Sequence, residues 1–419
     1  MTRQDAALKV GLQFPRGFSR STKFRWPLRR IGDYIRLNYG KALTADDRHS
    51  GPIRVFGSNG QCGWHDEALA KGPGVILGRK GQGPLGVEWC DDDFWVIDTA
   101  YFVAPTSEDI SLKFFFYATQ YIGLNHLKDG TSNPSLSREV FYNQAFPVPP
   151  LYIQNRIAEL LSFYDDLIDI NNRRICILNE TARRIYREWF VEFRFPGHEK
   201  AHLSEHHGDD LPSGWQWVRV GDAFEVLGGA TPSTKEPAYW DAGTIPWFSP
   251  SDLTRSKRMF LSEGEKKITL SGLENCSARL FPPYSVMMTS RATLGVLAIN
   301  KTPACTNQGF ITCIPNDRIT CSHLYLWLAA SAAELEMLAT GATFKEITKR
   351  AFKDYGVVLA PPDIERLFFE RTWPLLQMIE TLEAQNENLR MTRDLLLPKL
   401  LSGEVDISTI NTEQLTLTA

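Results

Sequence analysis

Several kinds of feature are missing from this 419-residue sequence, and each absence excludes a class of protein. No stretch approaches about 18 consecutive apolar residues, and the N-terminus lacks the apolar core of a signal peptide. We therefore expect a cytoplasmic protein without membrane contact. The seven cysteines form no CxxC pair, which argues for reduced thiols and against a disulfide framework or a zinc site.

Catalytic motifs are missing as well, since there is no P-loop, no HExxH pair and no nuclease-like Asp…Glu-x-Lys cluster. Residues 81–86 spell GxGxxG, but a dinucleotide loop must open a helix, and here strand character resumes at Val87. Residues 281–284 imitate the Pro-Pro loop of amino-methyltransferases, yet Phe281 cannot accept a hydrogen bond from an amine. We predict no catalytic, cofactor or metal site in this chain.

An overall excess of positive charge is also missing, since 46 lysines and arginines face 49 acidic residues. The formal net charge of −3 is unfavourable for a nucleic-acid binder, because neutralisation of phosphates supplies most sequence-independent affinity. The first 30 residues, however, hold eight lysines and arginines against the single acid Asp5. This basic segment is either a solvated tail or an arm that contacts phosphates.

What the sequence does contain is an internal repeat of roughly 200 residues. Ile31-Gly32-Asp33 is echoed by Val220-Gly221-Asp222, and each copy reaches a double proline, at 149–150 and 361–362, before a long helical pattern. Other echoed residues are Leu136, Arg138 and Phe141, which correspond to Ile347, Lys349 and Phe352. Short strand-like runs, glycine-rich turns and one helical stretch predict a mixed α/β domain in each copy. The repeat therefore predicts two similar domains, each followed by one long helix.

The two helical patterns alternate steps of four and three residues, as the seam of a coiled coil does. The first seam consists of Ile157, Leu161, Tyr164, Ile168, Asn171, Ile175, Leu178, Ala182, Ile185 and Trp189. The second consists of Leu375, Ile379, Leu382, Asn386, Leu389, Arg393, Leu396 and Leu400. The alternative, in which each helix lies alone on its own domain, fits the strict seven-residue spacing less well.

Each seam contains one asparagine, and an antiparallel pairing can bring Asn171 opposite Asn386. The same pairing brings Ile168 opposite Leu389, Ile175 opposite Leu382 and Leu178 opposite Ile379. Because a buried amide without a partner costs roughly 1–3 kcal/mol, facing amides would penalise a slipped register. The alternative is that both amides bond water at a loosely packed seam.

Further motifs give the sequence a close resemblance to a known family. They are Gly-Arg-Lys-Gly at 78–81, Ser-Arg-Ala-Thr-Leu-Gly at 290–295, Thr-Asn-Gln-Gly-Phe at 306–310, Arg-Arg-Ile-Tyr-Arg-Glu-Trp-Phe at 183–190 and Leu-Pro-Lys-Leu-Leu-Ser-Gly-Glu at 397–404. Together with the repeat, they resemble the specificity subunits of type I restriction-modification systems over residues 24–405. The first copy departs from this pattern where Asp98-Thr99-Ala100-Tyr101 replaces the Asn-Gln-Gly-Phe turn.

The resemblance implies an α+β fold in which two long helices, forming an antiparallel coiled coil, join two similar target-recognition domains as a pseudo-two-fold repeat. The expected parts are a basic N-terminal extension (1–23), recognition domain 1 (24–150), helical spacer 1 (151–195), a linker (196–213), recognition domain 2 (214–361), helical spacer 2 (362–403) and a C-terminal tail (404–419). Histidines 202, 206 and 207 of the linker could bind metal, but solvated linker histidines are the simpler interpretation.

The resemblance also implies a function. Such a subunit is not an enzyme: it reads a split sequence in double-stranded DNA, one half per domain. Its helices dock two modification subunits, which methylate adenine N6 with S-adenosylmethionine, and the assembly recruits restriction subunits that translocate and cut DNA with ATP and Mg²⁺. These cofactors belong to the partners, and none is expected on this chain.

Polar residues in the glycine-rich loops are the expected DNA contacts, because arginine pairs with guanine, lysine with phosphate or guanine, and amides with adenine. The foremost are Arg79 and Lys80 in the first domain and Arg291 and Thr293 in the second. The remaining candidates are Ser58, Asn59, Gln61, Thr131 and Ser132 in the first domain, and Asn307, Gln308, Thr343 and Lys345 in the second. Trp64, Trp89 and Trp247 are expected in the core. The alternative for these loops is that they only turn the chain.

Two other functions stay open at this point. One is a recognition fragment of another restriction-modification type, which would need a methyltransferase or nuclease encoded elsewhere. The other is a coiled-coil scaffold that binds only protein. The identity of copurifying partners discriminates among the three.

Overall fold

The protein is described from a computed structural model, which covers residues 17–18, 22–200, 211–341 and 345–407. Contacts divide the chain into two compact units, one made of Met1–Ile168 with Asn388–Ala419 and the other of Asp169–Glu387. None of the described helices combines the length and apolar character needed to cross a membrane.

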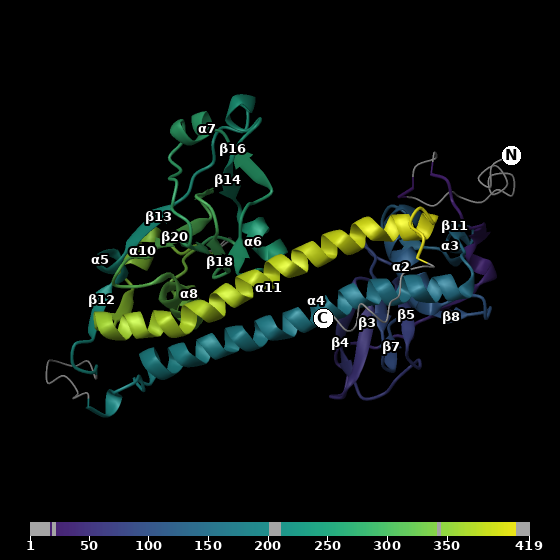
Figure 1. Ribbon diagram of the computed structural model, residues 1–419, viewed down its shortest axis with the longest axis horizontal. Helices are drawn as coiled ribbons and strands as arrows, with labels where there is room; N and C mark the ends of the chain where they lie inside the picture. The colour runs from purple at the N-terminus through teal and green to yellow at the C-terminus, as the bar shows by residue number, and fades with distance from the viewer. Residues whose placement is uncertain (1–16, 19–21, 201–210, 342–344, 408–419) are drawn as a thin grey trace. The chain divides into compact units, whose positions relative to one another are not determined.

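Unit 1 contains two principal sheets (Figure 1). The first is antiparallel, in the order β2 (Ile35–Tyr39), β8 (Ala100–Pro105), β5 (Gly74–Gly78) and β6 (Val87–Cys90). The second has the order β4 (Gly60–His65), β3 (Ile53–Gly57) and β7 (Phe94–Val96), with β7 parallel to β3. The remaining elements are β1 (Leu28–Arg30), η1 (Ile31–Asp33), α2 (Leu112–Ile122), η2 (Asn125–Leu127), β9 (Lys128–Asp129), β10 (Ser135–Leu136), α3 (Arg138–Tyr142) and β11 (Ala145–Pro147).

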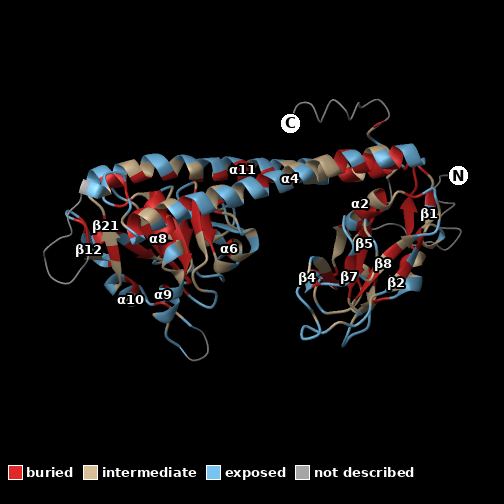
Figure 2. Ribbon diagram, turned by 90° about the horizontal axis from the view of Figure 1, so that it is seen from below, coloured by how far each residue is buried: buried red, intermediate tan, exposed pale blue. Residues whose placement is uncertain are grey.

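The core of unit 1 forms where α2 packs on the first sheet (Figure 2). All five residues of β5 are buried, as an uninterrupted apolar strand requires when both its faces are covered. Phe114, Phe115 and Tyr117 of α2 are completely buried in the same cluster.

Unit 2 repeats the strand order of both principal sheets and adds one strand to the larger sheet. Its larger sheet has the order β13 (Glu225–Gly228), β20 (Phe310–Ile314), β17 (Val286–Thr289), β18 (Leu297–Asn300) and β15 (Phe260–Leu261). Its smaller sheet has the order β16 (Lys266–Ile268), β14 (Ile245–Phe248) and β19 (Cys305–Thr306), with β19 parallel to β14. Only β15 has no counterpart among the described strands of unit 1. The other elements are η4 (His198–Lys200), β12 (Gln216–Arg219), α5 (Val220–Ala223), η5 (Pro237–Tyr239), α6 (Pro250–Ser256), α7 (Leu270–Glu274), α8 (Cys321–Ala330), α9 (Ala332–Met337), α10 (Lys349–Asp354) and β21 (Gly356–Leu359).

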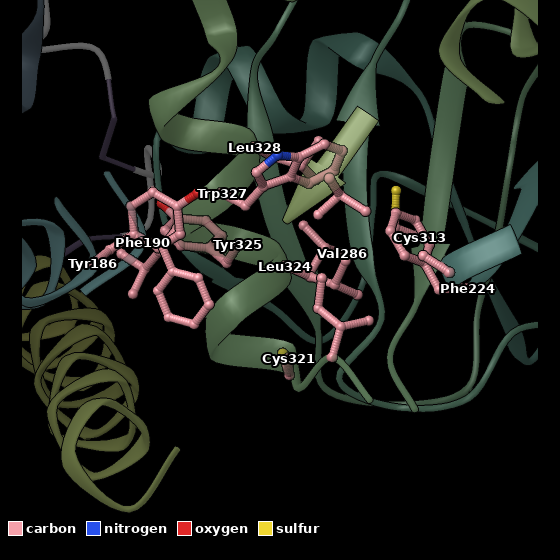
Figure 3. Close-up of a cluster of buried hydrophobic side chains, with 14 of the residues drawn as sticks. Tyr186, Phe190, Phe224, Val286, Cys313, Cys321, Leu324, Tyr325, Trp327 and Leu328 are labelled. Atoms are coloured by element: carbon pink, nitrogen blue, oxygen red, sulfur yellow. The ribbon is translucent and has the colours of Figure 1, made fainter. Parts of the chain in front are cut away.

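The core of unit 2 surrounds α8, whose residues 321–328 are all buried. Figure 3 shows Leu324, Trp327 and Leu328 of this helix near Val286 of the larger sheet. Tyr186 and Phe190 belong to the same cluster, so the end of the first long helix completes this core.

Two long helices contribute to both units: α4 (Leu151–Tyr186), which continues as a π-helix over Arg187–Val191, and α11 (Pro362–Ser402). In unit 2 the Asn171 amide donates to Asn386 Oδ1 at 3.0 Å, and the Asn386 amide donates to Asn172 Oδ1 at 3.0 Å. The predicted pairing of Asn171 with Asn386 is therefore found, with Asn172 as an unforeseen third member.

In unit 1 the two helices are joined by a charged contact instead. The seam residue Arg393 pairs with Asp165, whose other oxygen accepts a hydrogen bond from the Tyr117 hydroxyl at 2.6 Å. The partners lie on α11, α4 and α2, so this contact ties both long helices to the core of unit 1.

Two expectations can be judged from these elements. The GxGxxG segment does run into a strand, β6, rather than a helix, so it lacks the helix that a dinucleotide site needs. The placement of Trp64 in the core was wrong: this side chain on β4 is 53% exposed, because β4 is an edge strand with a largely solvent-facing middle. Trp247 is buried as expected, and Trp89 is partly buried against the unit 1 core.

Candidate nucleic-acid interface

The polar loops of unit 1 meet where β3 turns into β4 and where β5 ends. The Ser58 hydroxyl donates to the carbonyls of Lys80 and Thr99, the latter at 2.8 Å, and the Thr99 carbonyl also accepts from the backbone N–H of Arg79. A Cβ on Gly78 would lie 2.1 Å from the Ser58 carbonyl oxygen, so only glycine allows this approach. Ser58 thus has a structural role, holding the loops of Lys80 and Thr99 together.

A further loop, residues 128–136, joins this group. The Gln82 amide donates to the carbonyl of Ser132 at 2.9 Å, and the Lys128 ammonium donates to the carbonyls of Gly81 and Gly83 at 3.2 and 2.9 Å. The backbone N–H of Leu136 donates to the Arg79 carbonyl at 2.8 Å. The acceptors of these bonds are backbone carbonyls, so apart from Ser58 the side chains of the predicted contact residues are not needed to hold these loops together.

The predicted contact side chains of unit 1 consequently remain accessible. Asn59, Gln61, Thr131 and Ser132 are exposed. The Lys80 ammonium lies 3.7 Å from the Asp98 carboxylate. These are the polar groups that could meet DNA, and Ser58, which bonds inward, is the weakest of the first-domain candidates.

Arg79 is partly buried and oriented. Its guanidinium donates to the Asp98 carbonyl at 2.9 Å and lies over the Tyr39 ring, 4.7 Å from the centroid. A partly immobilised guanidinium loses less side-chain entropy when it binds, which suits a fork aimed at guanine or phosphate.

In unit 2 the corresponding loops meet at the end of β17. Arg291 pairs with Glu346 through two of its nitrogens, at 3.1 and 2.8 Å, and the Ala292 N–H donates to the Lys345 carbonyl at 3.2 Å. The Lys345 ammonium lies 3.6 Å from the Glu336 carboxylate. Both predicted cations of this loop therefore have carboxylate partners.

The predicted amides of unit 2 take part in local contacts. Asn307 Oδ1 accepts from the Gly309 N–H at 2.8 Å, and Gln308 Oε1 accepts from the Thr231 hydroxyl at 2.7 Å. Their amide groups can still donate or rotate toward a ligand. Thr293 is exposed, and Thr343 lies outside the described residues, as do the three linker histidines and most of the basic N-terminal segment.

Backbone pairing shows which loop positions correspond between the domains. The backbone N–H of Leu136 donates to the Arg79 carbonyl, and in unit 2 the N–H of Ile347 donates to the Ser290 carbonyl. Lys80 forms an isolated β-bridge with Ser135, and Arg291 forms the equivalent bridge with Glu346. Lys80 is thus the counterpart of Arg291, whereas Arg79 corresponds to the buried Ser290. The foremost predicted arginines of the two domains, Arg79 and Arg291, therefore do not occupy corresponding positions.

Each domain also has a hollow lined by residues of corresponding strands, β2 in unit 1 and β13 in unit 2. In unit 1 it has a volume of about 580 Å³ and is lined by residues that include Arg36, Tyr39, Arg79 and Arg138. In unit 2 a hollow of about 810 Å³ runs along β13 and is lined by residues that include Arg279, Lys349 and Lys353. Arg36, Tyr39 and Arg138 were not among the predicted contacts, although the echo of Arg138 in Lys349 pointed to this place.

One group of side chains could hold a metal ion among the described residues. His49, His65 and Asp66 place one donor atom each within 4.8 Å of one another. They lie at the opposite end of the β3–β4 hairpin from the loops, and His65 Nδ1 already accepts the His49 N–H at 3.1 Å. The group is therefore separate from the interface.

A comparison with protein families identifies the family of the chain that carries these loops. The family described as "Type I restriction modification DNA specificity domain" matches residues 25–180 and 212–390. The chain belongs to this family. Both recognition domains and most of both long helices lie within the matched ranges.

Individual relatives agree with this assignment. The MjaIX specificity subunit of a type I restriction enzyme from Methanocaldococcus jannaschii is 36% identical over 181 residues, and the match spans 43% of this chain but only 42% of that protein. The HindI specificity subunit from Haemophilus influenzae is 21% identical over 454 residues, covering 92% of this chain and 97% of its own length.

The fold has a solved counterpart. The S subunit of a type I restriction-modification system from M. genitalium matches with a TM-score of 0.61 at 16% identity, over 93% of this chain and 99% of that one. The predicted fold class, two similar mixed domains joined by two long helices, is confirmed.

Proposed function

We propose that this chain is the non-catalytic specificity subunit of a type I restriction-modification complex and that each domain reads one half of a bipartite sequence in double-stranded DNA. The observation that carries the proposal is the repeat itself: two domains of one topology present different side chains at corresponding loop positions. A common scaffold with divergent loops suits two unlike half-sites on one duplex.

The partners and cofactors extend this proposal. Two modification subunits would dock on α4 and α11 and methylate adenine N6 with S-adenosylmethionine. Restriction subunits would add translocation and cleavage driven by ATP and Mg²⁺. The two helices carry exposed apolar side chains that a docked subunit would cover, namely Ile170, Ile177, Met378 and Leu395.

The test is to purify the chain from its native host and to map methylated adenines in that genome with and without its gene. A methyltransferase should copurify, and one split adenine-methylated motif should disappear on deletion. The purified chain alone should neither methylate nor cut DNA. An unchanged methylation map, or methyl transfer by the chain alone, would contradict the proposal.

The helices offer a second test. Seven residues inserted into one helix add two turns, about 10 Å. We expect the gap between the half-sites to change while both half-sites stay the same. An unchanged gap would refute a measuring role for the helices.

A further inference from the structure

Three arginines from separate elements of unit 1 converge on one hollow. Arg36 comes from β2, Arg79 from the loop after β5 and Arg138 from the start of α3. Convergence of side chains that are far apart in sequence is a property of the folded domain rather than of one basic run.

Tyr39 organises this group. The guanidinium carbons of Arg79 and Arg138 lie 4.7 and 4.4 Å from its ring centroid, within the range of cation–π attraction. Tyr39 is 48% exposed, and its ring centroid lies 5.2 Å from that of Tyr101, whose hydroxyl donates to the Leu136 carbonyl at 3.0 Å. Tyr39 is therefore a supported aromatic platform that orders guanidinium groups at its faces.

The positive charge of this hollow exceeds the negative charge that lines it, with three arginines against one glutamate. Within the described part of the chain, Arg36, Arg79 and Arg138 form no ion pair, and Glu139 is the only acidic residue that lines the hollow. Arg79 donates to a neutral carbonyl. Cations placed close together repel one another, so the arrangement becomes favourable when an anion binds between them.

The second domain shows that the fold does not require this cluster. Three residues after the aspartate of the repeated Gly-Asp pair, Arg36 is replaced by Glu225; six residues after it, Tyr39 is replaced by Gly228. At the position of Arg79 stands Ser290. Of the whole cluster, only Arg138 has a basic counterpart, Lys349.

We propose that Arg138, ordered by the Tyr39 ring, and Arg36, which lines the same hollow, bind a phosphate of the DNA backbone beside the half-site of the first domain. This deepens the proposed function and rests on it. Arginine fits a phosphate through two parallel N–H donors, and such contacts fix the position of a protein on DNA without reading sequence. Apart from Arg138, whose counterpart is Lys349, the second domain does not share the residues of this phosphate site.

The test measures how binding of the full chain, with any native subunits that copurify, depends on salt. The probe is a random-sequence duplex, because a phosphate contact needs no target. Each lost contact should lower the slope of log affinity against log salt by about 0.9. Because both arginines bind the same phosphate, we expect the double variant Arg36→Gln/Arg138→Gln to show this loss of about 0.9. Each single variant should show part of it.

Three further variants serve as controls. Lys71→Gln removes an exposed positive charge from a turn of the same domain and should leave the slope unchanged. Tyr39→Phe keeps the ring and should behave as the parent chain does, whereas Tyr39→Ala should lose affinity. Circular dichroism and thermal midpoints close to those of the parent confirm that each variant is folded.

The outcomes separate the two proposals. If the parent chain binds DNA with the expected salt dependence but Arg36→Gln and Arg138→Gln match Lys71→Gln, the phosphate site is wrong and the proposed function stands. If these variants weaken only certain target sequences, the residues read bases and the phosphate assignment is wrong. If the parent preparation does not bind DNA, both proposals fail.

Discussion

In both halves of the chain a buried polar side chain fastens the start of the long helix to its domain, but the chemical groups differ. Gln154 on α4 and Glu365 on α11 occupy corresponding positions, both buried, at the start of the long helices. Gln154 accepts the Ser111 N–H at 2.9 Å and donates to the carbonyls of Asp109 and Pro149. Glu365 accepts the Thr320 N–H at 2.8 Å and lies 2.8 Å from His323 Nδ1. A neutral amide in one half thus corresponds to a carboxylate and an imidazole in the other.

The difference shows that position is shared while charge is not. Each side chain ties the long helix of its half to the residue before the domain's own helix, Ser111 before α2 and Thr320 before α8. Only in the second half does this contact depend on the ionisation of a side chain, that of Glu365. Burial opposes the charge on Glu365, but attraction to His323 and hydrogen bonds from His323 and Thr320 outweigh it, so the pKa of Glu365 is lowered.

The largest loss of stability is expected when the contact of Glu365 with His323 and Thr320 is removed. Glu365→Ala leaves the Thr320 N–H and His323 without their partner in the core. Breaking a buried pair in this way costs about 3–5 kcal/mol. Urea unfolding of the full chain should show a destabilised transition for unit 2.

The matched control is Gln154→Ala in unit 1, which removes neutral hydrogen bonds and should cost less, about 1–3 kcal/mol. Equal losses in the two variants would show that the charge of Glu365 adds nothing.

The two units should also differ in their stability at low pH. Because the folded pKa of Glu365 lies below its ordinary value of 4.5, its ionisation stabilises the fold above that value, and this contribution is lost as pH falls through the folded pKa. Gln154 does not titrate, so unit 2 should lose stability first in acid. Glu365→Gln, which copies the first half, should flatten the pH dependence of unit 2 below 4.5. A parent and variant with the same acid profile would contradict this origin.

Loop variants test whether the halves read DNA separately. Arg79→Ala should weaken or relax one half-site by about 1–3 kcal/mol if its fork binds guanine. Arg291→Ala should affect only the other half-site. Methylated-motif mapping of each variant gives the answer, and uniform weakening over all sequences would reassign that arginine to a phosphate.

The asparagine contact can be broken in steps. Asn171→Leu leaves the Asn386 carbonyl oxygen without its donor and should cost about 1–3 kcal/mol, whereas the double change Asn171→Leu/Asn386→Leu should recover much of the loss. Equilibrium unfolding measures both variants. A double variant no better than the single one would show that the contact does not set the register.

The smallest effect is expected at Glu346. Its exposed ion pair with Arg291 must be broken before Arg291 can bind DNA, and such pairs are worth about 0.2–1 kcal/mol. Glu346→Gln should therefore strengthen DNA binding slightly, and only through the second domain. Competition binding with duplexes altered in one half-site measures this, and weaker binding would show that Glu346 positions Arg291 for DNA.

Much of this architecture could be predicted because short-range sequence patterns determine it. The seven-residue spacing predicted both long helices and the contact of Asn171 with Asn386, since helix geometry converts spacing into a face. The echoed turns predicted the duplicated domain. The Tyr39 cluster could not be predicted, because Arg79 and Arg138 come close to β2 only through sheet pairing and the fold of α3. The correspondence of Lys80, rather than Arg79, with Arg291 likewise depends on backbone pairing that a short motif does not reveal.

The discontinuity of unit 1 has a consequence during synthesis. Its apolar cluster includes Leu161 of α4 but also Leu397, Leu400 and Leu401 of α11, which the ribosome adds only after the whole of unit 2. At about 5–20 residues per second, that interval is roughly 10 to 50 s. Unit 2, being continuous in sequence, can fold during this time, while part of the unit 1 core remains open to chaperones or aggregation. Unit 1, whose synthesis begins first, is thus the unit whose folding is completed last.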